Sequence, residues 1–382
     1  MSKSLNFILL FISSLVFLNL SVYLSMLGLQ SYSYILIFSY FFISFIFVAL
    51  NKFEVRIPLL YFFCYFVFLI VNLFYIGLSD NDFSDYFSKN ILYFIYFLFT
   101  YFVFFKSYEA GINIGVLFKF LLLLIVFLNV LDFFGQGKIF HQFEGFDTRA
   151  SGFYVNANNA AYAILACLVL YICNNENKTK WYWFILALIG VFFTLSRGGM
   201  IVWFFIYIFS LFLKRIDIKD SLIIMAIPLF FILNFFILDK LFFSYSNNYN
   251  LITDRLNIFS GSSNISQNVE DDSRYALVQQ SIDLFWNSPV WGNGFFSLLR
   301  NGSSQLNHNQ YLLILDDYGL IGFMIFAVML YSAYSKRNSI IYVFLFSCAF
   351  FTHEFFYSYT FLMVFSILLA SKYAKLSSKL NR

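Results

Sequence analysis

The sequence has few charged residues. Only 12% of its 382 residues are Asp, Glu, Lys or Arg, whereas 61% are hydrophobic. A soluble chain of ordinary composition carries about 25% charged residues, and a soluble fold of this length could not cover so much apolar surface. A lipid bilayer removes the difficulty, because apolar side chains can face lipid instead of water. The scarcity of charge therefore excludes an ordinary soluble domain and predicts an all-α polytopic membrane protein.

Cysteine is also scarce, and its spacing excludes two kinds of site. The four cysteines fall inside apolar runs and form no CxxC pair, so neither a disulfide framework nor a zinc site is indicated. The sequence contains no P-loop, no GxGxxG and no nucleophile elbow. Its net charge of +4 gives no reason to propose a nucleic-acid partner. We therefore expect no metal and no other cofactor.

About twelve apolar runs can be read as membrane-spanning helices, because a crossing helix needs roughly 20 apolar residues. Two places leave alternatives open, since 181–213 could form one bent helix and 339–371 could be re-entrant. The runs are 6–27, 32–50, 57–77, 90–105, 113–134, 155–173, 181–196, 198–213, 221–239, 309–331, 339–352 and 356–371.

Basic residues are unevenly distributed over the loops, and this predicts the orientation. With both termini in the cytoplasm, most of the 24 Lys and Arg residues fall in cytoplasmic segments, while acidic residues gather at the outer face. Merging 181–213 into one span would place the basic segment KRIDIKD on the outside. The charge pattern therefore favours two short spans there. We expect a single integral membrane domain over 1–382.

One outer loop, about 240–308, is the only sizeable soluble piece, and it carries an amphipathic helix. We expect that helix over 273–287, ending before Pro289 and lying on the outer membrane interface. Its apolar face comprises Tyr275, Val278, Ile282, Phe285 and Trp286.

Four groups of polar residues lie on the outer side of this map, and two of them precede apolar runs. In RASGFYVNANN, Arg149 stands upstream of Asn156 and Asn158. These asparagines could cap a helix while the arginine reaches lipid headgroups. In SRGG at 196–199, Arg197 has no acidic residue nearby in the sequence. Its planar guanidinium matches the oxygens of phosphate or pyrophosphate, although it too could reach headgroups.

The third group is Arg274 with the turn Gly292-Asn293-Gly294 behind it. Glycine at both ends of this turn permits positive φ and lets the chain bend back over the membrane. The arginine could instead form a salt bridge with Asp271 or Asp272.

The fourth group is LNHNQYLLILDDYGLIG at 306–322. A histidine at a membrane–water boundary can take a proton from a hydroxyl near neutral pH, and His308 stands at this position. A lone histidine is more often a capping or hydrogen-bonding residue. Asp316 and Asp317 are costly inside an apolar run, so we expect them to pair with an arginine or to face a cavity.

In this order, the motifs resemble those of the O-antigen ligase/polymerase superfamily of bacterial membrane glycosyltransferases. The matching segments are RASGFYVNANNAAY, SRGG, SPVWGNG and HNQYLLILDDYGLIG, within a motif-bearing region of about 145–325. The resemblance implies a GT-C-like, metal-independent enzyme of the bacterial inner membrane. Its donors would be undecaprenyl-pyrophosphate-linked glycans, and its active site would lie on the periplasmic face.

The resemblance also implies roles for particular residues. Arg197 and Arg274 match the arginines thought to hold the pyrophosphate, and His308 matches the histidine proposed to activate the acceptor hydroxyl. Asp317 stands where the family commonly has glutamate. The expected substrate-binding residues are Arg149, Asn156, Asn158, Gly292, Gly294, Asn309, Tyr311 and Asp317.

Three functions stay open at this point. A polymerase would extend a lipid-linked repeat unit of O-antigen or capsule, whereas a ligase would transfer the glycan to lipid A core or protein. The richness in Phe, Ile, Asn, Lys and Tyr resembles products of AT-rich antigen clusters, which favours the polymerase. A flippase or solute transporter is the alternative of another class. By family analogy, a polysaccharide chain-length regulator is a plausible partner beside membrane lipid.

Overall fold

The structure, a computed structural model, is helical throughout the part of the chain that it describes. Those residues divide into two compact units, each described by itself below. The first unit comprises Met1–Asn113, Val269–Ser339 and Leu345–Arg382, and the second comprises Ile114–Asn268 and Ile340–Phe344. The described ranges are 2–50, 57–78, 84–135, 139–140, 149–175, 177–233, 268–303, 306–352 and 355–380.

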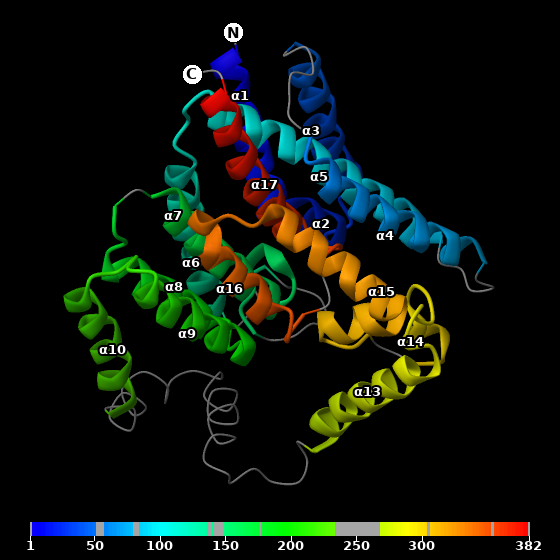
Figure 1. Cartoon of the computed structure of the whole chain (residues 1–382). Helices are drawn as coiled ribbons and strands as arrows, with labels where there is room; N and C mark the ends of the chain where they lie inside the picture. The colour runs from blue at the N-terminus through cyan, green and yellow to red at the C-terminus, as the bar shows by residue number, and fades with distance from the viewer. Residues whose placement is uncertain are drawn as a thin grey trace. The chain divides into compact units, whose positions relative to one another are not determined.

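The first unit is held together by its longest helix packing against the C-terminal helix. α5 and α17 run side by side (Figure 1). The Ser366 hydroxyl of α17 donates to the Phe97 carbonyl of α5 at 3.1 Å. The helices are α1 (Ser2–Phe17), α2 (Leu20–Met26), α3 (Gln30–Leu50), α4 (Leu59–Leu78), α5 (Ser84–Glu109), α13 (Asn268–Asn287), α14 (Ser297–Arg300), α15 (Gln310–Ala333) and α17 (Tyr359–Leu380), with α16 (Ser339–Cys348) shared between the units.

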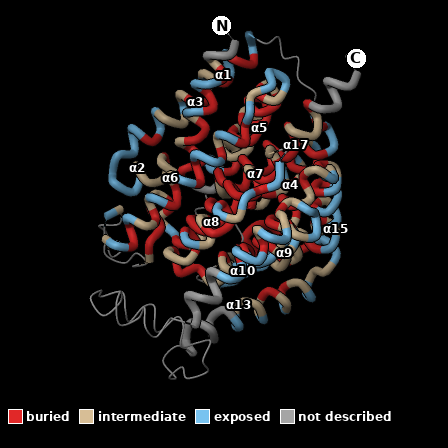
Figure 2. The backbone as a smooth tube through the Cα atoms, turned by 90° about the vertical axis from the view of Figure 1, so that its left-hand side faces the viewer, coloured by how far each residue is buried: buried red, intermediate tan, exposed pale blue. Residues whose placement is uncertain are grey.

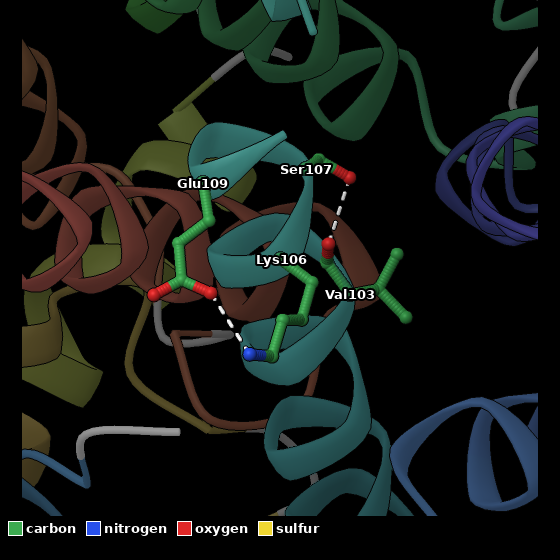
Figure 3. A network of polar contacts seen from close by, with 4 residues as sticks. All are labelled: Val103, Lys106, Ser107 and Glu109. Carbon is green, nitrogen blue, oxygen red and sulfur yellow. Dashed lines mark hydrogen bonds and ion pairs between the residues drawn. The ribbon is translucent and has the colours of Figure 1, made fainter. Parts of the chain in front are cut away.

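The last two turns of α5 contain two polar contacts within the helix (Figure 3). Lys106 forms an ion pair with Glu109 at 2.8 Å, and the Ser107 hydroxyl donates to the Val103 carbonyl at 2.7 Å. A lysine in the last turn also complements the negative end of the helix dipole. The placement of this end in the cytoplasm stays a prediction.

The second unit is built around α7, which is buried on nearly every side (Figure 2). A helix that is apolar all round requires cover on every face, and α6, α8 and α9 supply it. The elements of this unit are α6 (Ile114–Phe134), the 3₁₀ turn Gly152–Tyr154, α7 (Ala157–Asn174), α8 (Trp181–Phe193), α9 (Arg197–Phe212) and α10 (Ile218–Leu233).

Each apolar run read from the sequence overlaps a helix, but fewer helices meet the length and hydropathy of a full span. Five described helices do so, or six if the bent pair of α1 and α2, at 50° to each other, is one span. Helices and composition together indicate a multi-pass membrane protein. The count of twelve spans stays a prediction, as does the GT-C-like arrangement.

The two ambiguous regions resolve into separate helices. The segment 181–213 forms α8 and α9, and Leu195 between them has a φ of 52°, so one continuous helix is excluded. The segment 339–371 forms α16 and the start of α17. At about 1.5 Å per residue, the 10 residues of α16 reach about 15 Å. That is half of the hydrocarbon thickness of about 30 Å, so α16 is too short to cross alone.

The helix expected over 273–287 is confirmed as α13, which begins at Asn268 and ends at Asn287; the outer placement of its loop stays a prediction. The side that packs against the protein carries the buried residues Ser281 and Leu284, whereas Tyr275 and Trp286 are exposed. The inward face is therefore not the apolar face read from the sequence. The placement of α13 on a membrane interface stays a prediction, and residues 240–267 of the loop lie outside the described residues.

Candidate functional site

In the second unit, Arg197 occupies the first position of α9. The preceding Ser196 is the N-cap, and its hydroxyl accepts from the Gly199 backbone N–H at 3.1 Å. Serine is among the preferred N-cap residues because its oxygen satisfies a backbone donor that has no partner within the helix. The SRGG motif is thus a helix start, with the arginine beside the uncompensated N–H groups.

A second helix begins next to it. Asn156 caps α7 by accepting from the Asn158 N–H at 2.8 Å. The Ser196 hydroxyl donates to the Asn158 side-chain oxygen at 2.7 Å. Close approach is possible because Gly199 has no Cβ; an added one would lie 2.7 Å from the Ala161 Cβ. One side-chain hydrogen bond therefore joins the N-termini of α7 and α9.

The charge at these helix starts is entirely positive. Neither α7 nor α9 has an acidic residue in its first turn, although acids are favoured there. Among the described residues, the half-buried Arg197 has no hydrogen-bond or ion-pair partner for its guanidinium. Two helix N-termini with an unneutralised arginine form a natural site for an anion.

Asp132 holds the segment that follows Arg149, and sequence reasoning missed it. Its carboxylate, completely buried in the last turn of α6, accepts from the backbone N–H groups of Ser151 and Gly152 at 2.9 and 3.1 Å. A carboxylate with two such donors fixes the loop that leads into α7. An acid inside an apolar run was the signal that could have identified it.

In the first unit, His308 is exposed, and the residues around it are anchored. The Asn307 amide donates to the Ser281 hydroxyl of α13 at 2.9 Å. Asn309 caps α15 by accepting from the N–H groups of Tyr311 and Leu312 at 3.0 and 3.2 Å. The imidazole is therefore presented to the surroundings from a fixed backbone.

The next residues extend this anchoring. The Gln310 N–H donates to the Ala349 carbonyl at 2.7 Å, and the Gln310 side-chain oxygen accepts from the Phe355 N–H at 3.2 Å. The Tyr311 hydroxyl donates to the Phe346 carbonyl at 3.0 Å. Asn309 and Tyr311 thus both stabilise the start of α15. Their expected contact with substrate stays a prediction.

Helix α15 is interrupted at Gly319, whose φ of 64° and ψ of −163° are not helical. The segment after α13 fills the gap. The Gly294 N–H donates to the Asp317 carbonyl at 2.8 Å, and Leu320 donates to the Pro289 carbonyl at 2.9 Å. A Cβ on Gly292 would lie 2.4 Å from the Tyr318 nitrogen. The glycines of SPVWGNG and DDYGLIG thus allow two backbones to meet, and binding of substrate by Gly292 and Gly294 stays a prediction.

The two aspartates of α15 differ in their surroundings. Asp317 accepts from the Phe296 N–H at 3.1 Å and from the N–H and hydroxyl of Ser297 at 3.0 and 2.9 Å, with the Arg300 charge nearby. Asp316 is completely buried beside Ser281, and among the described residues neither carboxylate oxygen meets a donor at hydrogen-bonding geometry. Among the described residues neither aspartate forms an ion pair with an arginine, so the expected pairing is not seen, and Asp317 is held by backbone and serine donors instead.

The expected site residues fall into two groups. The second unit brings together Asn156, Asn158 and Arg197 at the paired helix starts, with Arg149 upstream of the segment that Asp132 holds. The first unit holds Arg274 in α13, with its side chain outside the described residues. The rest of the first-unit group comprises Gly292, Gly294, His308, Asn309, Tyr311 and Asp317. Within the described ranges, no three His, Cys, Asp or Glu residues are placed to hold a metal ion.

Comparison with known families confirms the resemblance carried by the motifs. Residues 182–327 match the O-antigen ligase family. The matched segment contains Arg197, Arg274 and His308, whereas Arg149, Asn156 and Asn158 precede it. The match supports the O-antigen ligase/polymerase superfamily and does not distinguish its two activities. No curated protein matches the chain.

Proposed function

We propose that this protein is a glycosyltransferase that moves a glycan from undecaprenyl pyrophosphate to an acceptor hydroxyl. One observation carries the proposal: the N-termini of α7 and α9 are joined by the Asn158–Ser196 bond, with Arg197 at the junction and no acidic residue in either first turn. This combination suits a pyrophosphate. The family match over 182–327 supports the same class of reaction.

The donor half of the reaction needs charge neutralisation. Undecaprenyl pyrophosphate leaves with its negative charge increased on the oxygen that was bound to the sugar. Arg197 and Arg274 would neutralise that oxygen, because a guanidinium can bind two phosphate oxygens at once. The backbone N–H groups at the start of α9 would add further donors.

The acceptor half needs a base. His308 would take the proton of the incoming hydroxyl, whose oxygen then forms a bond to the anomeric carbon while the bond from that carbon to pyrophosphate breaks. Attack opposite the leaving group inverts the anomeric configuration. The imidazolium returns its proton to water before the next cycle.

The favoured acceptor is a second lipid-linked repeat unit, which makes the protein a polymerase of O-antigen or capsule. A ligase that transfers the glycan to lipid A core or protein is the second candidate, since the matching family is described as an O-antigen ligase. In both cases the site would face the periplasm, with the polyprenyl tail against the Phe- and Leu-rich helices. A chain-length regulator would be a partner of the polymerase.

A deletion strain complemented with variants tests this proposal. Arg197→Ala, Arg274→Ala and His308→Ala should each abolish polymer while the protein remains in the membrane. The matched control is Arg215→Ala, because Arg215 follows the end of α9, at the opposite end from Arg197. Polysaccharide gels give the readout, and wild-type polymer from all three site variants would refute the assignment.

The same gels separate the alternatives. Reduction of the ladder to a single repeat on core identifies a polymerase, and loss of all core attachment identifies a ligase. Removal of residues 255–300 should destroy a transferase, whereas a flippase or transporter need not lose its activity.

A further inference from the structure

Two asparagine side chains connect α13 with α15 and the segment that precedes it; both helices are labelled in Figure 1. The Asn307 amide, which is 3% exposed, donates to the hydroxyl of the completely buried Ser281 at 2.9 Å. The Asn293 amide donates to the Leu284 carbonyl of α13 at 2.7 Å and to the Asp316 carbonyl of α15 at 3.3 Å. Asn307 thus connects the segment before α15 to α13, and Asn293 bonds to both helices.

These hydrogen bonds connect the two residues that the proposed reaction assigns to different tasks. Asn307 directly precedes His308 in the sequence. Ser281 follows Arg274 by seven residues, which is about two turns of α-helix, so the two positions share one side of α13. The Asn307–Ser281 bond therefore holds α13, which carries Arg274, at a fixed position along the segment that carries His308.

The Asn307–Ser281 contact lies next to a buried carboxylate. Asp316 lies completely buried beside Ser281, without a donor at hydrogen-bonding geometry among the described residues. Burial of a polar group without a partner is destabilising, and a well-packed apolar side chain could fill the same space. Hydrogen bonds are directional, whereas apolar contacts are not. A polar cluster at this point therefore defines the placement of α13 against the segment before α15 more narrowly than apolar packing would.

We propose that Asn307 and Asn293 are positioning residues that set the placement of His308 relative to Arg274. Neither would touch the substrate. This inference rests on the proposed glycosyl transfer, because it assigns the two asparagines to the alignment of that reaction. Misplacement of a reacting group by about 1 Å can reduce a rate about 100-fold, so loss of their hydrogen bonds should lower turnover and leave donor binding intact.

The test uses the purified full chain with lipid-linked repeat units extracted from the deletion strain. Asn307→Ala should lower kcat by about 10- to 100-fold with an unchanged KM for the donor. Asn293→Ala should act in the same direction. Ser281→Ala should also lower kcat, and its combination with Asn307→Ala should lower it no further, because both changes remove the same hydrogen bond.

Asn338→Ala is the matched control. Asn338 is 2% exposed and donates to the Ser371 hydroxyl at 2.7 Å, so it makes the same kind of bond in the same unit, past the other end of α15. Its loss should destabilise the protein to a similar degree without changing kcat of the folded fraction. An equal fall in kcat for Asn307→Ala and the control Asn338→Ala would overturn the inference. A raised donor KM with unchanged kcat in Asn307→Ala would also overturn it.

A distance measurement makes the result independent of turnover. Spin labels at the exposed positions Gln279 of α13 and Leu320 of α15 should give one narrow distance distribution in the wild type and a broadened one in Asn307→Ala. An unchanged distribution would overturn the inference. Failure of the wild type to transfer any glycan would instead reject the proposed function.

Discussion

The two groups of polar residues use helix geometry in different ways. In the second unit, the capping side chains of α7 and α9 bond to each other, and the Arg197 cation is left with no partner among the described residues. In the first unit, the backbone on both sides of His308 is held by contacts with α13 and with the segment after α16. The second-unit group concentrates positive charge at two helix starts, whereas the first-unit group holds the backbone around His308 in a fixed orientation.

This difference matches two chemical requirements. An anion is bound by the summed field of several donors, and that field tolerates small displacements. Proton transfer requires two heavy atoms at about 2.6–3.2 Å, so its base needs a rigid support. In the proposed reaction, the paired helix starts of the second unit would hold the charged donor together with Arg274 of the first unit, and the segment around His308 would activate the acceptor.

The sharpest test exchanges the two charged residues for close relatives. Arg197→Lys keeps the charge but loses the planar fork, so donor affinity should fall while the pH dependence of turnover is preserved. His308→Gln should lower kcat by at least about 100-fold, since a general base contributes typically 100- to 10,000-fold. Donor binding to the purified His308→Gln protein should remain at the wild-type level. A loss of donor binding in His308→Gln would break the division between the two groups.

The second prediction concerns the meeting of backbones at the break in α15. Gly292 and Gly302 both have positive φ, at 77° and 88°, but only Gly292 lies against other atoms. Both substitutions by alanine share the conformational strain, and Gly292→Ala should add about 1–3 kcal/mol of overpacking. Thermal unfolding in detergent measures the difference. Equal melting temperatures for the two variants would argue against close docking at this point.

The third prediction compares the two helix caps. Ser196→Ala and Asn309→Ala each remove an N-cap, a change that costs about 0.5–2 kcal/mol. Ser196→Ala should weaken donor binding by about tenfold, which corresponds to 1.4 kcal/mol. Asn309→Ala should reduce kcat and leave donor binding unchanged. Isothermal titration calorimetry and initial-rate measurements on the same preparations distinguish these outcomes. If the two variants behave identically, the two groups do not have separate tasks.

The smallest effect is expected away from both groups. Lys178 donates a hydrogen bond to Asp217 across the exposed side of the second unit and holds the pKa of the Asp217 carboxyl below its usual range. A lowered pKa stabilises the fold above the usual aspartate pKa, and this contribution is lost as the pH falls through the lowered value. Lys178→Ala should leave glycan transfer and the melting temperature at pH 7 unchanged, because exposed pairs contribute little. A marked loss of transfer would assign this surface a role in the reaction.

Much of the candidate site could be predicted from residue type alone. Arginines, asparagines and a histidine next to apolar runs are conspicuous, because their burial in lipid is costly. Asp132, Ser281 and Asn307 were missed, since their partners are 19 or more residues away. A single sequence gives no sign of which distant groups a buried serine or asparagine meets. The glycine motifs were noticed, but their function in backbone docking depends on a segment 27 residues away.

The sequence by itself determined the helical class, the position of the helices along the chain, and the separation of α8 from α9, although α17 extends nine residues beyond the predicted run and 6–27 forms two helices. These features follow from hydrophobic runs and from local breaks in them, which depend on neighbours in the chain. The tertiary structure decided how short α16 is, which face of α13 packs inward, and how the break in α15 is filled. Those features depend on hydrogen bonds between distant segments. The scarcity of charged residues predicted a membrane protein. Packing determined which of the few polar side chains are hydrogen-bonded within the protein and which, such as that of Arg197, have no partner among the described residues.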